Sequence, residues 1–271
     1  TFQEKYFKET DFQWYKYVYQ PAPMYSADVS VSGGSTGVRY YLSGGALSQE
    51  GLRMGSSYKK AFGRINVDAN LANWAKANVN TQVSYADTRV SPFGNNNAVG
   101  GGLAAMNAPF ASPYDPNTGS ELERVPLLDL ATPKHVISTN PAKTNAFILS
   151  ANGNLTLTPI KNLTVRSLVG LELNYGDSRS RTLPSYYRAY GNGSSERAYS
   201  MASNITITNT AAYNMSFGEH HLTALLGHEY TNYKDDNFSA SGSGILDDRL
   251  FLLNNVTQNK SVGEDTNGYA F

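Results

Sequence analysis

The stretch SNITITNTAAYNMSF, residues 203–217, alternates between apolar and polar side chains over almost its whole length. Ile205, Ile207 and Tyr213 stand at odd positions, while asparagine, threonine and serine fill most of the even ones. Successive side chains of a strand point to opposite faces of the sheet. The stretch therefore predicts a β-strand with one apolar and one polar face.

The same alternation recurs along most of the chain. In one further case Val165, Leu171 and Leu173 alternate with Thr164 and Glu172. The pattern predicts about eight antiparallel strands. We place them at residues 27–32, 38–48, 59–70, 76–88, 144–158, 163–175, 199–216 and 220–233.

The predicted strands are long, and their polar faces are unusual. Most run roughly ten to fifteen residues, whereas about five or six is typical of soluble sheets and about nine to eleven let a tilted strand cross a bilayer. Their polar faces carry mainly Asn, Thr, Ser and Gln instead of the Lys and Glu that usually coat a solvated sheet. Both features favour a transmembrane barrel whose polar face lines a wet lumen.

Short and long connections alternate along the chain. Tight turns are predicted at 33–37, 71–75, 159–162 and 217–219, and long connections at 49–58, 89–143, 176–198 and everywhere after Lys234. In an antiparallel meander, alternate connections lie at opposite ends of the sheet. One rim would thus carry the short turns and the other the long loops, as in transmembrane barrels with short periplasmic turns.

The composition argues against several classes of function. Lys and Arg balance Asp and Glu at 22 each, which predicts no nucleic-acid partner. The chain has no cysteine, so a disulfide framework and a cysteine-based zinc site are both excluded. Apolar runs stay far below the roughly 18 residues typical of a membrane-spanning helix. No charged-then-apolar leader opens the chain, so we expect a mature or excised sequence.

These patterns alone leave three readings open. The first is a segment of a large transmembrane barrel. The second is a small eight-stranded outer-membrane barrel that acts as an anchor or adhesin, because eight strands can close unaided. The third is a soluble secreted β-protein that binds or cleaves glycans.

Three groups of residues separate these readings. The first group is Thr10-Asp11-Phe12 with SVSGGS (30–35), YYLS (40–43) and QEG (49–51); the second is GRINVD (63–68); the third is FGEHHL (217–222) with LGHE (226–229). Together they resemble the SusC/RagA family of TonB-linked, that is TonB-dependent, outer-membrane transporters, and they cover most of the chain in the family's order.

The resemblance implies an all-β fold, an antiparallel up-and-down meander that forms part of a large transmembrane β-barrel. Family members close with about 22 strands around a plug in the lumen. Residues 1–271 would supply about the first third of such a barrel, and we expect the plug domain and the remaining strands to be absent from this chain.

The resemblance also implies a function and partners. The chain would be a barrel segment of a TonB-dependent nutrient importer in the outer membrane of a Gram-negative bacterium. Its expected partners are a SusD-like surface lipoprotein, TonB through the absent plug segment, outer-membrane lipid, and an oligosaccharide or peptide ligand. Loops 89–143 and 176–198 would face the lipoprotein and the ligand.

One stretch fits the G-x-S-x-G pattern of serine hydrolases, with Ser35 at the nucleophile position between Gly33 and Gly37. A nucleophile elbow needs a helix after the serine, but Val38 opens a β-branched and aromatic run. The glycines suit a tight hairpin turn. We predict a turn here, no catalytic residue and no enzymatic activity, since no pair of carboxylates stands out as a glycosidase acid and base either.

No metal or cofactor site is predicted. His220 and His221 are adjacent and would point to opposite faces of a strand, so they cannot share one metal with each other. Asp115-Pro-Asn-Thr-Gly begins like a calcium loop, but the twelve-residue spacing places Pro126 where a bidentate glutamate belongs. An ordinary turn is the better interpretation.

Aromatic residues fall into two groups. Five lie near predicted strand ends, where a girdle at the membrane interface would place them: Trp74, Tyr85, Tyr175, Phe217 and Tyr230. Four others gather in or beside a long loop, namely Tyr186, Tyr187, Tyr190 and Tyr199. These four are our candidates for ligand contact, by stacking on a sugar ring, while packing within the loop is the more common role of such a cluster.

Overall fold

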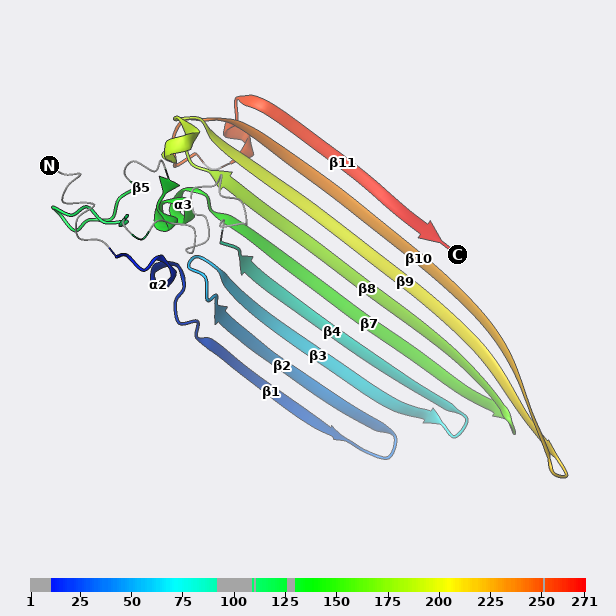
Figure 1. The fold of residues 1–271 in the computed structure, drawn as a ribbon. Helices are drawn as coiled ribbons and strands as arrows, with labels where there is room; N and C mark the ends of the chain where they lie inside the picture. The colour runs from blue at the N-terminus through cyan, green and yellow to red at the C-terminus, as the bar shows by residue number, and fades with distance from the viewer. Residues whose placement is uncertain (1–10, 92–108, 110, 126–129, 251) are drawn as a thin grey trace.

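The computed structural model describes residues 11–91, 109, 111–125, 130–250 and 252–271, and most of them belong to one antiparallel sheet. The sheet has nine strands in the order β1-β2-β3-β4-β7-β8-β9-β10-β11, so each strand pairs with its neighbours in the chain apart from a small excursion between β4 and β7 (Figure 1). The bounds are β1 Met24–Gly34, β2 Val38–Glu50, β3 Ser57–Ala72, β4 Ala75–Arg89, β7 Ala142–Ile160, β8 Leu163–Thr182, β9 Gly193–Phe217, β10 His220–Ile245 and β11 Gln258–Ala270. The predicted all-β meander is confirmed.

The nine strands differ from the predicted eight in number and length. The expectation of a long connection after Lys234 was wrong, because β10 continues to Ile245 and is followed by β11, Gln258–Ala270. β9 and β10 have 25 and 26 residues. The sequence predicts shorter strands because charged side chains such as Asp236 interrupt the apolar positions of β10, whereas the backbone of β10 stays paired with β9 beyond them.

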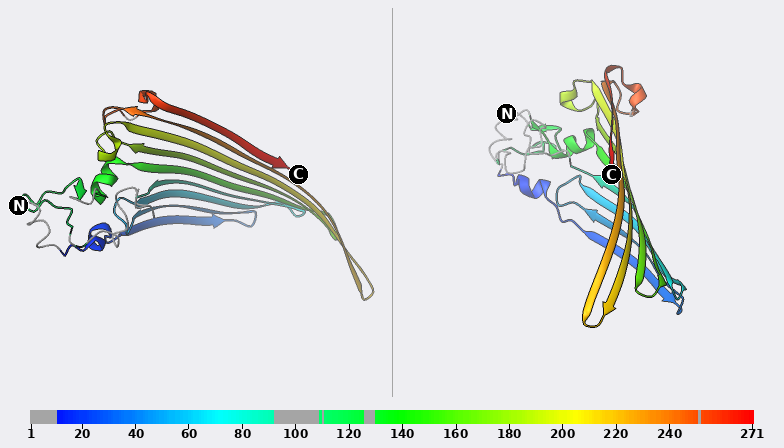
Figure 2. Two further views of the ribbon diagram at one scale, coloured as in Figure 1. Left: turned by 45° about the horizontal axis from the view of Figure 1, so that its top comes forward. Right: turned by 90° about the vertical axis from the view of Figure 1, so that its right-hand side faces the viewer.

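The turns fall on two rims, as the alternation of connection lengths predicts. β1–β2, β3–β4, β7–β8 and β9–β10 join through two or three residues, and the other connections lie at the opposite end of the sheet (Figures 1 and 2). Asn162 and Gly218 take positive φ values of 70° and 61° in two of the tight turns, a conformation that asparagine and glycine adopt most easily.

The two faces of the sheet have different chemistry. On one face of β8 lie Val165, Val169, Leu171 and Leu173, and the register sets Ile207 of β9 beside Val169. Many of these apolar side chains are exposed, for example Val169 and Ile205. A soluble sheet would bury such a face, so its exposure fits contact with lipid.

The sheet curves but stays open within the described residues (Figure 2). β1 pairs only with β2, and β11 only with β10. The reading of a small closed eight-stranded barrel is therefore wrong for this chain, since its first and last strands do not meet. None of the helices in the described part of the chain is long and apolar enough to span a membrane.

Small elements gather at the long-loop end of the sheet (Figure 1). They are α2 Trp14–Val18, β5 Arg124–Val125, β6 Leu130–Ala131, α3 Pro133–Thr139, η2 Tyr187–Ala189 and η3 Leu253–Asn255. Two buried clusters form here, one around Trp14 and Val125 and one around Val136 and Tyr186. Within the described residues, the two buried hydrophobic clusters thus lie at the loop end, and no other element packs over the faces of the sheet.

Candidate functional site

The polar face of the sheet is a continuous surface of amides, hydroxyls and a few charges. Register places Arg64, Gln82, Ser150, Glu172 and Asn204 in one row across five strands. Arg64 Nη2 donates a hydrogen bond to Gln82 Oε1 at 2.7 Å. Such a face can hydrogen-bond water and a polar solute along its length, which suits the wall of an aqueous passage.

A first loop-end cluster joins α2 to the segment that follows β4. Trp14 is 2% exposed and packs with Val18, Ala111 and Val125. Tyr17 donates a hydrogen bond to the Glu121 carboxylate. These contacts attach α2 to the segment that follows β4.

Glu121 is the charged centre of this cluster. Lys134 Nζ lies 2.7 Å from Glu121 Oε2, and this hydrogen bond raises the pKa of Lys134. Burial, together with the hydrogen bond to Glu121, raises the pKa of Tyr17 well above its usual range. Tyr17 therefore stays protonated and acts as a donor at any physiological pH.

The second loop-end cluster contains two of the four tyrosines predicted to contact ligand. Tyr186 is buried at 7% exposure and stacks on His135 with ring centroids 5.8 Å apart. Tyr187 meets Tyr186 edge to face at 5.3 Å and lies beneath Arg124 at 5.5 Å. Their rings pack α3 against the β8–β9 connection, so the structure gives both tyrosines a packing role.

His135 is nearly buried in this cluster. Its Nε2 atom has no hydrogen-bond partner within the described part of the chain. Burial lowers the pKa of His135, and the nearby Glu123 acts weakly in the opposite direction. The ring is therefore neutral at pH 7, which is compatible with its stacking on Tyr186.

The other two predicted tyrosines stand apart from this cluster. Tyr190 ends η2 in a left-handed conformation with φ 50° and is 89% exposed. Tyr199 lies on β9 on the apolar face, 6.1 Å from Tyr175 and beneath Arg197 at 4.5 Å. The structure brings Tyr186 and Tyr187 together and separates Tyr190 and Tyr199 from them, and ligand contact at all four remains a prediction.

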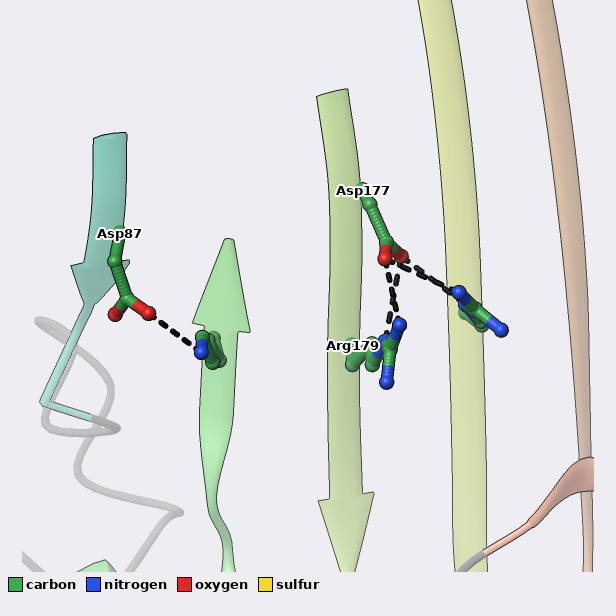
Figure 3. A network of polar contacts seen from close by, with 5 residues as sticks. Asp87, Asp177 and Arg179 are labelled. Carbon is green, nitrogen blue, oxygen red and sulfur yellow. Dashed lines mark hydrogen bonds and ion pairs between the residues drawn. The ribbon is translucent and has the colours of Figure 1, made fainter. Parts of the chain in front are cut away.

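Charged side chains form a network at the loop end of the apolar face, where Tyr199 pairs with Asp177. Asp177 accepts hydrogen bonds from Arg179 on its own strand and from Arg197 on β9, and Lys143 Nζ lies 2.5 Å from Asp87 Oδ2 (Figure 3). Sequence reasoning missed this network because all its members except Asp87 come from strand ends that were assigned to long connections. The signal was present as Asp-x-Arg at positions 177 and 179, where the alternation of β8 simply continues.

An aromatic ladder on the polar face was also missed. Tyr233 of β10 stacks on Tyr269 of β11 at 5.3 Å, and Tyr269 stacks on Phe271 at 5.6 Å. The contact between Tyr233 and Tyr269 requires β11 to pair with β10. The sequence analysis placed a long connection in this part of the chain and therefore did not predict the ladder. Three aligned rings on a solvent-facing wall can stack against flat apolar faces of a ligand.

The expected turn at Ser35 is confirmed. Ser35 lies between β1 and β2, and its backbone N–H donates to Val38 O at 2.7 Å. Its Oγ accepts hydrogen bonds from the backbone N–H groups of Gly37 and Val38. Val38 begins a strand and not a helix, so the elbow geometry of a hydrolase nucleophile is missing.

The expected turn at Asp115 is confirmed as well. Asp115 Oδ1 accepts hydrogen bonds from the backbone N–H groups of Asn117 and Thr118. Among the described residues no group of three His, Asp or Glu side chains is placed to hold a metal ion. Pro126 lies outside the described residues.

The aromatic girdle is matched in part. Tyr85 and Tyr175 both pair with Phe147 and form a row at the loop end of the apolar face. Trp74 and Phe217 lie at the short-turn end. Tyr230 was misplaced, because the extension of β10 to Ile245 leaves it in the middle of the strand.

Comparison with known proteins gives a consistent set of matches. No family model matches the chain. A TonB-dependent receptor, P26 of Formosa agariphila, is 27% identical over 251 residues, which are 87% of this chain and 24% of that protein. The chain thus spans about a quarter of the curated relative.

Solved structures agree with this match. The RagAB peptide transporter is 28% identical with a TM-score of 0.87, over 96% of this chain and 30% of that one. The RagAB peptide importer in its open-open state gives 29% identity and a TM-score of 0.86 over the same shares. The siderophore receptor PiuA of Acinetobacter baumannii, at 12% identity and a TM-score of 0.50, shares the fold alone.

Together these matches support the resemblance drawn from the sequence. Over almost its whole length the chain is similar to a barrel segment of the RagAB peptide transporter, and the proteins it is similar to are named as receptors and transporters.

Proposed function

We propose that the chain forms wall and outer loops of a TonB-dependent outer-membrane importer that takes up peptides with a SusD-like lipoprotein. The observation that carries this proposal is the fit of 96% of the chain to the RagAB peptide transporter at a TM-score of 0.87. The two chemically different faces of the sheet support the same conclusion. One face is suited to lipid and the other to an aqueous lumen.

The geometry also supports an orientation in the membrane. Short turns gather at one rim and the packed loops at the other, and transmembrane barrels turn their long loops outward. The Trp14 and Tyr186 clusters would then form part of the outer entrance. A surface lipoprotein would cover this entrance and deliver ligand to it.

An oligosaccharide is the second candidate ligand, and one observation favours it. The Tyr233–Tyr269–Phe271 ladder offers flat rings on the polar face, and such rings suit the apolar faces of sugars as well as peptide side chains.

Uptake by whole cells tests the proposal. Cells that carry the full-length protein should accumulate labelled oligopeptides, and deletion of its gene or of the gene for a SusD-like lipoprotein partner should abolish this uptake. A protonophore should abolish it too, because TonB takes its energy from the inner membrane. Uptake of labelled oligosaccharides but not peptides would change the ligand class, and recovery of the protein in a detergent-free soluble fraction would overturn the proposal.

A further inference from the structure

Four cations form a row across the loop end of the sheet. Register pairs Arg89 of β4 with Lys143 of β7, Lys143 with Arg179 of β8, and Arg179 with Arg197 of β9. Paired residues of adjacent strands lie on the same face. Four neighbouring strands therefore present one positive side chain each, side by side on one face.

This row lies on the apolar face, just beyond its apolar band. The band on β8 runs from Val165 to Tyr175, which at about 3.3 Å per residue and a tilt of about 45° spans roughly 23 Å of membrane thickness. That is close to the apolar band of about 25 Å in outer-membrane barrels. Arg179 lies four residues beyond Tyr175 on the same face, where lipid head groups begin.

Two carboxylates of the same face hold three of the four cations, Lys143, Arg179 and Arg197. Asp177 lies in the row between the aromatic residues and the cations, and its side chain is only 10% exposed, whereas that of Arg179 is 52% exposed. Figure 3 shows the Asp177 carboxylate bonded to two guanidinium groups, and Nη2 of Arg179 lies 2.7 Å and Nε of Arg197 3.1 Å from it. Asp87 holds Lys143 in the same way.

The network leaves a surplus of positive charge that points outward. The four cations face two carboxylates, and the carboxylates are the more deeply placed groups. Asp177 engages Nε and Nη2 of both arginines, so the carboxylate fixes each guanidinium in one orientation. A fixed pair of guanidinium groups with a neighbouring ammonium is suited to a phosphate, which guanidinium binds through paired hydrogen bonds.

We propose that Lys143, Arg179 and Arg197 bind the phosphate group of a phosphorylated lipid in the outer leaflet of the membrane. The ligand must carry both a phosphate and acyl chains, because the cation row continues directly into the apolar band of the same face. A solute in the lumen would meet the opposite face. This inference rests on the proposed function for the orientation of the loop end toward the outer leaflet.

Lipid retention by the purified full-length protein tests the site. The probe is bis-phosphorylated lipid A, added to the detergent-solubilised protein and counted by native mass spectrometry, with dephosphorylated lipid A as the comparison lipid. The double variant R179A/R197A should lose at least about tenfold in retention of the phosphorylated lipid. R179K/R197K should retain more than the alanine pair, and Arg166→Ala, on the same strand but the polar face, should bind like the wild type.

The outcomes separate the site from the transport function. Equal retention by R179A/R197A and wild type, or equal retention of both lipids by wild type, would overturn the site even in cells that import peptide. Displacement of the lipid by inorganic phosphate at low millimolar concentration would also overturn it, because it would indicate an anion site that ignores the acyl chains. Loss of retention in R179A/R197A supports the site whether or not wild-type cells take up peptide.

Discussion

Asp177 of β8 joins two strands through Arg197 of β9, with Oδ1 3.1 Å from Nε and Oδ2 3.1 Å from Nη2. The register does not place these two residues opposite each other, since Asp177 pairs with Tyr199 and Arg197 pairs with Arg179. The carboxylate therefore bridges diagonally and compensates the charge of two guanidinium groups that face each other as like charges on adjacent strands.

Asp177→Asn should destabilise the loop end of the sheet by about 1–2 kcal/mol, because it leaves Arg179 and Arg197 facing each other without their shared carboxylate. The partial exposure of both arginines keeps the effect below that of a fully buried pair. The thermal midpoint of the folded barrel, followed by its mobility in unheated SDS gels, measures the change.

Asp28→Asn on β1 is the matched control, since Asp28 is an exposed strand aspartate far from this network. It should leave the midpoint unchanged. If Asp177→Asn and Asp28→Asn melt at the same temperature, the bridge contributes nothing to stability.

The assignment of the two faces leads to a second prediction. Ile205→Arg should reduce the amount of folded protein in the outer membrane, because arginine in the middle of a lipid-facing strand costs about 2–4 kcal/mol. Ile205 lies beside Leu171 in the middle of the apolar band. The folded fraction in isolated outer membranes measures the effect.

Thr206→Arg is the control one residue along the same strand. Its side chain points to the polar face, beside Gly170 and Thr231, so the folded fraction should stay close to that of the wild type. A larger loss for Thr206→Arg than for Ile205→Arg would reverse the assignment of lipid and lumen faces.

The fold could be predicted from the sequence wherever alternation is strong. Val165 to Leu173 and Ile205 to Tyr213 mark strands whose apolar face must meet something apolar, and both strands lie where they were predicted. Short turns at Ser35 and Asn162 were equally visible, because glycine and asparagine tolerate the required backbone. A strand with lipid on one face and water on the other needs such regular alternation along its membrane-crossing length.

The loop-end features could not be predicted for a physical reason. Beyond the apolar band, a strand position on the outer face can carry a polar or charged side chain. The alternation of apolar residues therefore ends before Asp177, Arg179 and Arg197, and the sequence predicts a loop there although the strands remain paired. The Tyr233–Tyr269 contact depends on register between β10 and β11, and alternation alone does not set which residues of two strands meet. Burial of Tyr186 similarly depends on α3, which contacts it across some fifty residues of chain.

Tyr186→Ala should loosen the second loop-end cluster without unfolding the sheet. Removal of a large buried ring costs about 3–5 kcal/mol where the cavity cannot collapse, and the neighbours of Tyr186 are α3 and the β8–β9 connection. Hydrogen exchange should therefore rise in residues 133–139 and stay unchanged in β7 and β8. Tyr190→Ala, at an 89% exposed position, should leave exchange at its wild-type level, and equal exchange in both variants would show that Tyr186 does not hold the cluster.

The same cluster should respond to pH through His135. Burial lowers the pKa of His135 in the folded cluster, so the opened cluster binds the proton more tightly than the folded one. The contribution of neutral His135 is then fully present above its ordinary pKa of about 6.5 and falls as the pH drops below that value. Glu123 is the charged group that opposes this loss.

Hydrogen exchange in α3 at pH 7.5 and pH 5.5, corrected for the intrinsic rate, measures this dependence. Wild-type protein should show lower protection at pH 5.5, and His135→Phe, which cannot be protonated, should show the same protection at both values. A wild-type protein whose corrected protection is equal at the two pH values would exclude the histidine as the cause.

The aromatic ladder should contribute to ligand binding if the polar face is the wall of the import passage. Tyr233→Ala and Tyr269→Ala each remove one ring of a stack with a 5.3 Å centroid spacing, and stacking of this kind contributes about 0.5–1.5 kcal/mol beyond the buried area. Each variant should thus weaken uptake or binding of the preferred ligand by roughly three- to tenfold. Tyr230→Ala removes a tyrosine of the same strand from the opposite, apolar face, so it should leave uptake intact at equal amounts of folded protein. Uptake that falls only for Tyr230→Ala would mean that ligand does not pass along the face on which Tyr233 and Tyr269 stack.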